Sequence, residues 1–504
     1  MTKTNDFRVV VMMAALALAV SATALVLVGP PASAANTLVV DDDKVECGKA
    51  TFTSIQDAVD AAGQGDLIRV CPGQYHESVI VDKPLTLAAE DRDALDALDC
   101  FDPAVATLDP TRHTIVDPAG SGFSVAFKLE ANKIDLSGFV VQGASVGIDS
   151  SDSFSGYRVH HNLIRQNTLF GMDFGSKGDT QYPQSRVDHN CFRDPAPPTA
   201  PGTSGTRSWG LVSELDDDSL WKFSDGPERD EWNARDLINA SIDHNSTFRN
   251  QVGLDIAGPG RHYQVTFANN VSREDNVIGI AIQNSKESRI VDNELSPIGR
   301  GIWVGGANEG LEITGNEATT GTIGIAFAPP NDAIDQFTEP TTNATVSGNT
   351  LTGQTGTGIF ASAARPGFWP GRLQESEILN NTTSDNAGSG IGLASGNNNN
   401  KLLGNTANLN TLDGIQLLVG SINNEVRGNT ANNNGRSGIH ATLGATGNTF
   451  KENSMHENGG NPNPATLPHA DARDDNPLLD GALQNEWINN DCDTDFPAGY
   501  ICGV

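Results

Sequence analysis

Aliphatic residues recur along this chain with a period of about 22–24 residues, and an asparagine marks each period. The unit reads I-x-x-N and is followed, six to nine residues later, by G-I-x-x. Its last four asparagines, Asn381, Asn405, Asn429 and Asn453, are each 24 residues apart. Short strands at such a spacing, with no helical segments between them, are typical of a solenoid. The pattern predicts coils of three short strands that stack at about 4.8 Å.

Each G-I strand alternates between an inward aliphatic position and an outward one, because successive side chains of a strand point to opposite faces. Ile415 is predicted to point inward and Gln416 outward. We expect glycine at crowded or left-handed corners. We expect the repeated asparagine at a turn, where its amide bonds the turn backbone and the equivalent amides of neighbouring coils. Such a ladder is structural and carries no chemistry.

Both ends of the repeat predict caps, which a solenoid needs because an open end exposes strand edges and apolar interior. Near the N-terminus, Thr53 and Gln56 form a predicted capping box. The residues that follow place Ile55, Ala58 and further apolar positions on one face of a short helix. After Asn458 the repeat fades into an Asn-, Pro- and Asp-rich segment, which we interpret as the opposite cap.

With these repeats and this opening segment, the chain resembles the right-handed parallel β-helix proteins of the pectin-lyase-like superfamily over roughly residues 37–460. The resemblance implies an all-β, single-stranded, right-handed parallel β-helix with about 22–24 residues per coil and a short N-terminal amphipathic cap helix. The predicted segments are a signal peptide at 1–34, the N-terminal cap and first coils at 35–143, β-helix repeats at 144–460 with long loop insertions at 193–236, and a C-terminal cap at 461–504.

The first residues predict export. Lys3 and Arg8 precede an apolar run at 9–28, and Ala32-Ser33-Ala34 then provides the small-x-small pattern of signal peptidase sites. The run is longer than the usual signal core, so an uncleaved membrane anchor is the alternative. We expect a secreted, extracellular protein with no membrane span after signal cleavage, in which cysteines oxidise.

The six cysteines are too few for a disulfide scaffold in a chain of 504 residues, and we expect them to tie down ends and loops. Cys47 and Cys71 flank the cap helix and first strand, and Cys492 and Cys502 lie in one short terminal stretch, so we predict a bridge within each of these two pairs. Cys100 and Cys191 remain, and they can pair only if the loop at 90–112 folds back on the coil near 191.

Composition and charge limit the fold class of this protein and the classes of molecule that it can bind. Hydrophobic residues at 37% and 53 glycines argue against a compact α/β enzyme with a large core. The net charge of −31 argues against a nucleic-acid partner, since phosphate contacts need Lys and Arg. The same repulsion applies to an acidic glycan unless a divalent cation bridges the two. We expect a monomer.

A first candidate site is the outward position that follows G-I or its variant, which holds Asp149, Asp173, Val212 and Asp255 on four successive coils. Asp149, Asp173 and Asp255 are therefore candidate catalytic carboxylates. Asp149 and Asp173 should lie about 5 Å apart by strand spacing, which suits a retaining-type carboxylate pair or a shared Ca²⁺. The alternative is a solvated acidic face.

A second candidate site is the residue before the repeated asparagine. His161, His189 and His244 occupy it on three consecutive coils, beside His160, Asp188 and Asp243. This arrangement permits a transition-metal site or a general base oriented by a carboxylate. The alternative is that the histidines bond the turn backbone and extend the asparagine ladder.

A third feature is the excess of chain at 193–236, because long loops on a solenoid cost little entropy and often build binding sites. Aromatic residues there and further along could stack on sugar faces or pack back onto the solenoid, and arginines could stabilise charge. The candidate substrate-binding residues are Trp221, Trp232, Trp303, Arg229 and Arg235.

These features favour an exported β-helix protein that binds a polysaccharide or cell-surface glycan and modifies it, as a lyase, epimerase or hydrolase, with calcium as a candidate cofactor. No catalytic motif of the superfamily's individual groups occurs as a set, and the fold alone does not select a chemistry. The alternatives are a non-catalytic structural or adhesive protein and a metal-related protein of the periplasmic β-helix type.

Overall fold

The computed structural model describes residues 35–90, 99–102, 105, 108–118, 124–193, 209–213, 236–256, 261–327, 339–362, 373–460, 469–479 and 484–503. The chain divides into two units, Met1–Ala35 and Asn36–Val504, and the strands lie in the second. The predicted signal peptide at 1–34 lies outside the described residues. No helix among those residues is long and apolar enough to cross a membrane.

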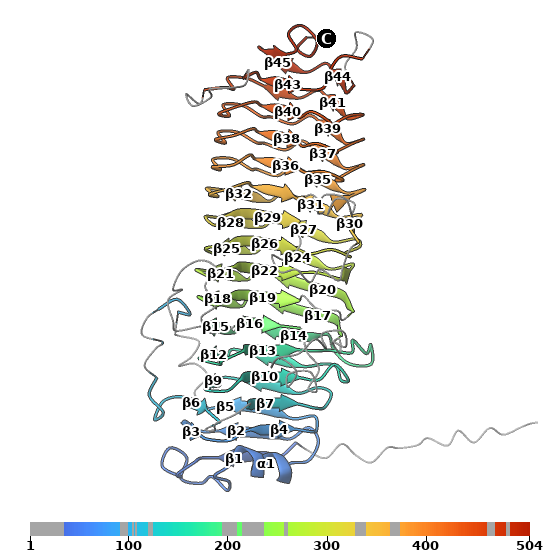
Figure 1. Cartoon of the computed structure of the whole chain (residues 1–504). Helices are drawn as coiled ribbons and strands as arrows, with labels where there is room; N and C mark the ends of the chain where they lie inside the picture. Colours follow the sequence, from blue (N-terminus) through green and yellow to red (C-terminus); the bar gives the residue numbers. More distant parts are fainter. Residues whose placement is uncertain are drawn as a thin grey trace, which may run out of the picture. The chain divides into compact units, whose positions relative to one another are not determined.

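The unit Asn36–Val504 is a right-handed parallel β-helix, as predicted: every pairing between its described strands is parallel, and each strand pairs with its equivalent one coil away (Figure 1). Three sheets run along the stack. Each coil contributes one strand to sheet A, then one to sheet B, then one to sheet C (Figure 1).

Sheet A precedes the asparagine turn. It consists of β1 (Thr37–Val40), β2 (Leu67–Val70), β5 (Thr86–Ala89), β8 (Asp135–Ser137), β11 (Arg158–His160), β14 (Ser185–Asp188), β17 (Leu237–Asp243), β20 (His262–Ala268), β23 (Ser285–Lys286), β24 (Arg289–Val291), β27 (Glu312–Thr314), β31 (Thr345–Ser347), β35 (Glu377–Leu379), β37 (Lys401–Leu403), β39 (Glu425–Arg427), β41 (Thr449–Lys451) and β44 (Glu486–Ile488).

Sheet B follows the asparagine turn. It consists of β3 (Gly73–Tyr75), β6 (Thr114–Val116), β9 (Val140–Gln142), β12 (Leu163–Arg165), β15 (Cys191–Arg193), β18 (Ser246–Phe248), β21 (Val271–Arg273), β25 (Glu294–Ser296), β28 (Glu317–Thr319) and β32 (Thr350–Thr352). Beyond β32 the stack continues through single bridges from Thr350 by way of Thr382, Thr406 and Thr430 to Ser454.

Sheet C carries the G-I strands. It consists of β4 (Val79–Val81), β7 (Val125–Leu129), β10 (Val146–Ser150), β13 (Phe170–Phe174), β16 (Trp209–Val212), β19 (Val252–Ile256), β22 (Ile278–Ile282), β26 (Arg300–Val304), β29 (Ile323–Phe327), β33 (Ile359–Ala361), β36 (Ile391–Leu393), β38 (Ile415–Leu417), β40 (Ile439–Ala441), β43 (Ala472–Asp474) and β46 (Asp495–Phe496). Two short pairs complete the set: β30 (Thr341–Thr342) with β34 (Leu373–Gln374), and β42 (Ser454–Met455) with β45 (Asp491–Cys492).

The core is one continuous column of inward side chains. Ile391, Ile415 and Ile439 are aligned on successive strands of sheet C and are fully buried, whereas Gln416 is half-buried on the opposite face. The inward–outward register predicted from the sequence is therefore confirmed at these coils. The glycine before each isoleucine is needed for close approach: a Cβ at Gly390 would lie 2.7 Å from the carbonyl oxygen of Gly414.

The asparagines form the predicted ladder. Each side-chain oxygen accepts hydrogen bonds from the backbone N–H and the amide of the preceding asparagine, as Asn429 Oδ1 does from Asn405 at 2.8 and 3.0 Å. The ladder runs through Asn162, Asn190, Asn245, Asn270, Asn293, Asn316, Asn349, Asn381, Asn405, Asn429, Asn453 and Asn490.

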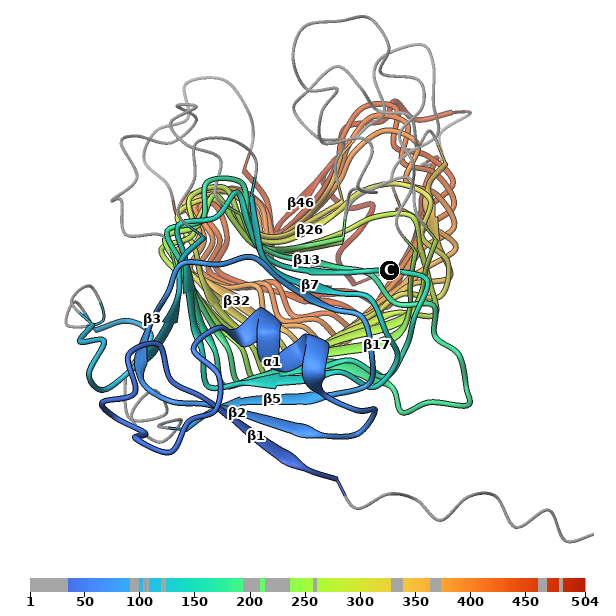
Figure 2. The same ribbon diagram turned by 90° about the horizontal axis from the view of Figure 1, so that it is seen from below.

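The predicted cap helix, α1 (Ile55–Ala61), lies at the N-terminal end of the stack (Figure 2). Its N-cap is Ser54, whose side chain accepts from Asp57 N, so the predicted cap at Thr53 was wrong by one residue. Glu77, from a later segment, accepts the free N–H groups of Ile55 and Gln56. That long-range contact replaces the predicted capping box.

At the other end the strands β43, β44 and β46 still pair with the coils before them. The carboxylate of Asp495 then accepts the backbone N–H groups of residues 499–502 and closes the last turn. The predicted bridges Cys47–Cys71 and Cys492–Cys502 are both present.

Candidate functional site

The acidic column has the predicted register on sheet C. Asp149 pairs directly with Asp173, and Asp173 with Val212. The alternative interpretation, a solvated acidic face, is wrong because Asp149, Asp173 and Asp255 have exposed fractions of only 5%, 2% and 4%. The physical reason is that the same outward face carries apolar side chains that cluster there. They are Val146, Phe170, Val212, Val252, Ile278 and Trp303.

Burial changes the ionisation of this column. It raises the pKa of Asp255 to about 8, so this carboxyl is largely protonated at neutral pH. Among the described residues, no third acidic, histidine or cysteine ligand joins Asp149 and Asp173 at the spacing of a metal site. The calcium pair and the catalytic carboxylates stay predictions.

The predicted aromatic platform is wrong at Trp303. This side chain is buried among Ala281, Ala326 and other apolar residues of sheet C, so it offers no ring face to a sugar. Trp221, Trp232, Arg229 and Arg235 lie outside the described residues.

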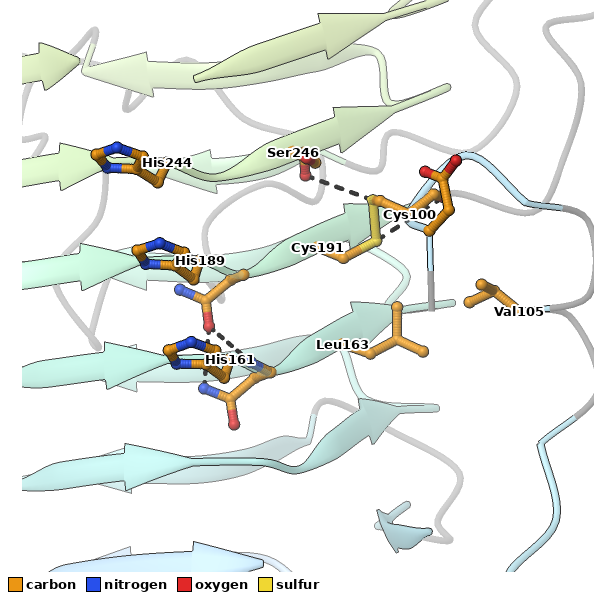
Figure 3. Close-up of a pocket in the computed structure, with 11 residues that line it drawn as sticks. Cys100, Val105, His161, Leu163, His189, Cys191, His244 and Ser246 are labelled. Atoms are coloured by element: carbon orange, nitrogen blue, oxygen red, sulfur yellow. Dashed lines mark hydrogen bonds between the residues drawn. A yellow bond between two sulfur atoms is a disulfide. The ribbon is translucent and has the colours of Figure 1, made fainter. Parts of the chain in front are cut away.

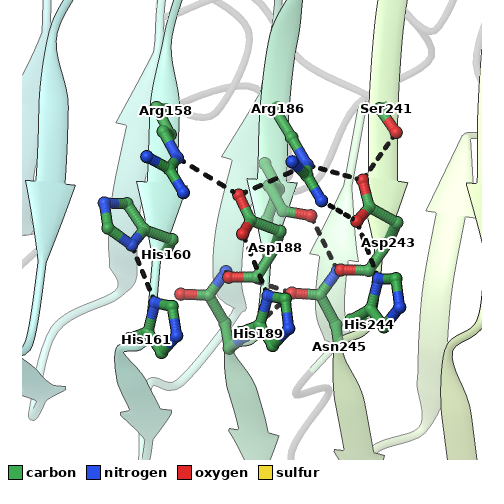
Figure 4. A network of polar contacts seen from close by, with 12 residues as sticks. Arg158, His160, His161, Arg186, Asp188, His189, Ser241, Asp243, His244 and Asn245 are labelled. Atoms are coloured by element: carbon green, nitrogen blue, oxygen red, sulfur yellow. Dashed lines mark hydrogen bonds and ion pairs between the residues drawn. The ribbon is translucent and has the colours of Figure 1, made fainter.

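The three histidines are brought together as predicted. His161, His189 and His244 follow β11, β14 and β17, and each has a backbone φ of +55°. Their rings stack in parallel, with centroids 4.9 Å apart at both steps and an angle of 3° between planes. The identical turn conformation on successive coils explains the stack, because each side chain leaves its coil in the same direction (Figure 4).

Carboxylates, and not the turn backbone, orient two of these rings. His189 Nδ1 lies 3.0 Å from Asp188 Oδ2, and His244 Nδ1 lies 2.9 Å from Asp243 Oδ1 (Figure 4). An ionised carboxylate only accepts hydrogen bonds, so in the neutral imidazole Nδ1 donates and Nε2 carries the lone pair. The side chains of His189 and His244 are 46% and 47% exposed, so solvent or a ligand can reach these rings.

Arg186 fixes the carboxylates behind the rings. Its guanidinium donates to both oxygens of Asp243, at 2.9 and 2.5 Å, and lies 3.5 Å from Asp188 (Figure 4). Burial alone would raise the pKa of Asp243, but hydrogen bonds from Arg186, Ser241 and His244 outweigh it and bring the pKa to about 2. Asp243 is therefore ionised at all ordinary pH values and can hold the His244 tautomer.

His161 is oriented through a second histidine that the sequence analysis did not assign a role. His160 Nε2 lies 3.0 Å from Asp135 Oδ1, and its Nδ1 lies 2.7 Å from His161 Nδ1 (Figure 4). If His160 donates to Asp135, its Nδ1 accepts from His161, and the lone pair of the neutral His161 ring then lies on Nε2. The signal in the sequence was the doublet His160-His161 one coil beyond Asp135.

A pocket of about 470 Å³ opens in front of the rings (Figure 3). Residues 99–102 and 105 form its other wall. The Cys100–Cys191 disulfide holds this wall, and Arg165 and Arg193 donate hydrogen bonds to its backbone carbonyls. We name this site the histidine pocket. Its lining includes Asp99, Cys100, Val105, His161, Leu163, His189, Cys191, His244 and Ser246. The loop thus folds back as the Cys100–Cys191 pairing required.

The histidine pocket does not form a three-histidine metal centre. Parallel rings at 4.9 Å keep the outer two far apart, and no three of these side chains bring ligand atoms within 4.8 Å of one another in the described structure. A single transition metal needs its ligands converging on one point. The arrangement instead offers a row of separate imidazoles, of which His189 and His244 are backed directly by an aspartate and His161 by His160.

Comparisons with known proteins agree with the fold. A family model described as "Right handed beta helix region" matches residues 334–463, and one described as "Periplasmic copper-binding protein (NosD)" matches residues 232–351. Neither spans half of the chain. No curated protein matches it. The fold is a right-handed parallel β-helix, as the repeats indicated, and the first of these family models carries the same description.

Solved structures with some likeness include the mannuronan C-5 epimerase AlgE4 A-module of Azotobacter vinelandii, at 13% identity over 84% of this chain and 93% of that chain, with a TM-score of 0.45. The alginate lyase of Paenibacillus sp. str. FPU-7 is 12% identical over 62% and 94%, with a TM-score of 0.41. The Dettilon tailspike protein is 13% identical over 83% and 67%, with a TM-score of 0.43.

Proposed function

We propose that this protein binds an extended polysaccharide in the histidine pocket and acts on it by proton transfer. The observation that carries the proposal is the row of three stacked imidazoles, at least two of them oriented by an aspartate through Nδ1. A solvent-facing nitrogen backed by a buried carboxylate is the arrangement of a general base.

The spacing favours a repeating ligand. Acceptors 4.9 Å apart along the coil axis recur at about the length of one sugar ring, so consecutive residues of a glycan can each donate a hydroxyl to one imidazole. Val105 and Leu163 also line the pocket, where they are almost wholly buried in one apolar cluster. The imidazoles are the polar groups of the pocket that can orient a ligand.

The chemistry follows from the tautomer. When a substrate O–H or C–H, or an attacking water, gives its proton to Nε2 of His189 or His244, the ring becomes an imidazolium whose charge is stabilised by Asp188 or Asp243. This step serves a lyase or epimerase, which removes a carbon-bound proton, and a hydrolase, which activates water. The choice among them remains part of the proposal.

Asp255 supports the acidic column as a second candidate site. Its raised pKa would let it donate a proton at neutral pH, the complement of a base. Asp149 and Asp173, which the coil of Val212 separates from Asp255, would then serve as carboxylates or calcium ligands. This site requires substrate to reach side chains that are almost wholly buried, which makes it the weaker of the two.

The test uses asparagine substitutions. Asn269 occupies the same turn position one coil beyond His244, with a φ of +54°, so His189→Asn and His244→Asn should preserve the turn. We expect at least tenfold weaker glycan binding in the double variant, measured by calorimetry after screening a glycan panel with and without Ca²⁺. Turnover should be lost, as followed by new reducing ends, unsaturated products or exchange of sugar protons with D₂O.

His456→Asn is the matched control, because this histidine also pairs with aspartates, Asp491 and Asp493, but lies near the C-terminal end. It should bind as the parent does. Unchanged binding in the His189/His244 double variant would refute the histidine pocket as the site. Loss of binding in Asp173→Asn or Asp255→Asn instead would favour the acidic column, and binding without turnover would support the non-catalytic alternative.

A further inference from the structure

A group of four carboxylates lies in the N-terminal cap, far along the chain from both candidate sites. Asp41, Asp42, Asp43 and Glu46 each place one oxygen so that all four oxygens lie within 4.8 Å of one another. Two oxygens on the same Ca²⁺ ion, each about 2.4 Å from it, can be at most about 4.8 Å apart. The group therefore meets the distance requirement for one shared ion.

Backbone hydrogen bonds orient these carboxylates and leave oxygens available. Asp41 Oδ2 accepts Cys47 N at 2.5 Å, Asp42 Oδ2 accepts Gln74 N at 3.0 Å, and Asp43 Oδ1 accepts Val45 N at 2.8 Å. In each residue one oxygen is held by the protein and the other accepts no hydrogen bond from the described residues.

Asp41 is the most informative member. Its exposed fraction is 0%, yet its Oδ1 has no hydrogen-bond partner within the described part of the chain. A buried carboxylate oxygen without a partner is costly, since its lost hydration is not replaced. A bound cation would replace that hydration.

The surroundings are negative and are shaped to the carboxylates. No lysine or arginine forms an ion pair with these four side chains in the described structure. Burial, together with the charges of Asp42 and Asp41, raises the pKa of the Tyr75 phenol, which reports the local negative field. A Cβ at Gly73 would lie 2.4 Å from Asp42 Oδ1, so glycine is what leaves room for that carboxylate.

We propose that Asp41, Asp42, Asp43 and Glu46 form a binding site for one hard divalent cation, with Ca²⁺ as the ligand. An all-oxygen donor set selects Ca²⁺ over copper or zinc. Mg²⁺ is disfavoured because it demands near-ideal octahedral geometry and gives up its water ligands reluctantly. The ion joins the loop that leaves β1 to the turn that enters β3, beside the Cys47–Cys71 bridge. This site is independent of the histidine pocket.

The experiment is calorimetric titration of the chelator-treated protein with Ca²⁺, Mg²⁺ and Zn²⁺ separately. We expect one Ca²⁺ per chain at the cap, with weaker binding of the other two ions. Asp43→Asn is the principal variant: the residue is exposed, and asparagine keeps the hydrogen bond to Val45 N, so the fold should survive. Its Ca²⁺ affinity should fall at least tenfold, because one ligand charge is removed. Asp41→Asn should do the same.

A second readout is local. Ca²⁺ should slow the reduction of Cys47–Cys71 by thiols in the parent protein and not in Asp43→Asn, as measured by peptide mapping. Asp385→Asn is the matched control, since Asp385 is an exposed turn residue with a φ of +58° on a distant coil. It should leave both readouts unchanged.

Unchanged affinity in Asp43→Asn and Asp41→Asn would overturn the proposal, as would preferential binding of Zn²⁺. If Asp173→Asn abolishes the Ca²⁺ heat and the cap variants do not, the ion belongs to the acidic column. The result of the Ca²⁺ titration does not depend on whether the parent protein or the histidine variants bind a glycan. The calcium proposal and the proposed function can therefore fail separately.

Discussion

Replacing Asn405 by alanine removes the centre of the asparagine ladder and allows its energetic value to be worked out. The side chain is fully buried. Its Nδ2 donates to Ile378 O at 2.8 Å, and its Oδ1 accepts Asn381 N at 2.9 Å. In the alanine variant both backbone groups lose their partner in a place that water does not reach.

The side-chain groups of Asn381 and Asn429 that bond Asn405 keep other hydrogen-bond partners in the variant. Asn381 Nδ2 still donates to Val346 O, and Asn429 Oδ1 still accepts the backbone N–H of residue 405. Two orphaned backbone groups remain, at about 1–3 kcal/mol each, so the free energy of unfolding should fall by about 2–6 kcal/mol. Asn408→Ala on the same coil is the control: this half-buried side chain accepts one bond, from Asn432 N, and should cost about 1 kcal/mol.

Urea unfolding measures the difference, and hydrogen exchange supplies a local check, because a stack of coils need not unfold in one step. The amide of Asn381 should exchange faster in Asn405→Ala than in the parent protein. Equal destabilisation by the two alanine variants, or an unchanged exchange rate at Asn381, would refute the assignment of ladder hydrogen bonds as a main source of coil stability.

Three further predictions concern the core, the acidic column and the pocket wall. Ile415→Ala should lower the free energy of unfolding by about 2–5 kcal/mol, whereas Gln416→Ala should change it by less than about 0.5 kcal/mol; equal effects in urea unfolding would contradict the coil register. Because burial raises the pKa of Asp255 from 3.8 to about 8, its stabilising protonated form is complete below pH 4 and is lost as the pH rises through 8. The free energy of unfolding should therefore fall progressively from about pH 4 to about pH 8 and level off above that. Asp255→Asn should remove that dependence, and a parallel pH profile for the variant would exclude this group as its source. Replacing Cys100 and Cys191 by serine should lower stability by about 2–5 kcal/mol in thermal melts and weaken glycan binding, and unchanged affinity would show that the pocket wall does not need its tether.

The fold was predictable because each coil obeys the same local constraints. The 24-residue spacing of Asn381, Asn405 and Asn429 fixes the length of a coil, and the alternation at Ile415 and Gln416 fixes which side faces the core. Every copy of the unit must meet the same short-range requirements, so a single sequence contains enough examples to reveal them.

The sites were only partly predictable, because they depend on contacts between segments far apart in the chain. The register of Asp149 and Asp173 could be read from the repeat, but their burial depends on apolar side chains of the same outer face. The stacking of His189 on His244 followed from the turn position, whereas the pocket in front of them depends on the segment that Cys100 draws in from more than fifty residues earlier.

The equivalence of the coils has a consequence for evolution. Each interior coil forms the same hydrogen bonds with the coil before it as with the coil after it. Asn381 donates its backbone N–H to Asn405 Oδ1, and Asn405 donates its own to Asn429 Oδ1. Duplicating or deleting one such unit therefore changes the length of the molecule without creating an unsatisfied surface. The number of coils sets the length, and the helix at Ile55–Ala61 and the carboxylate of Asp495 close the two ends. Selection can thus adjust how far apart the two ends are held while leaving the interior sequence rules untouched.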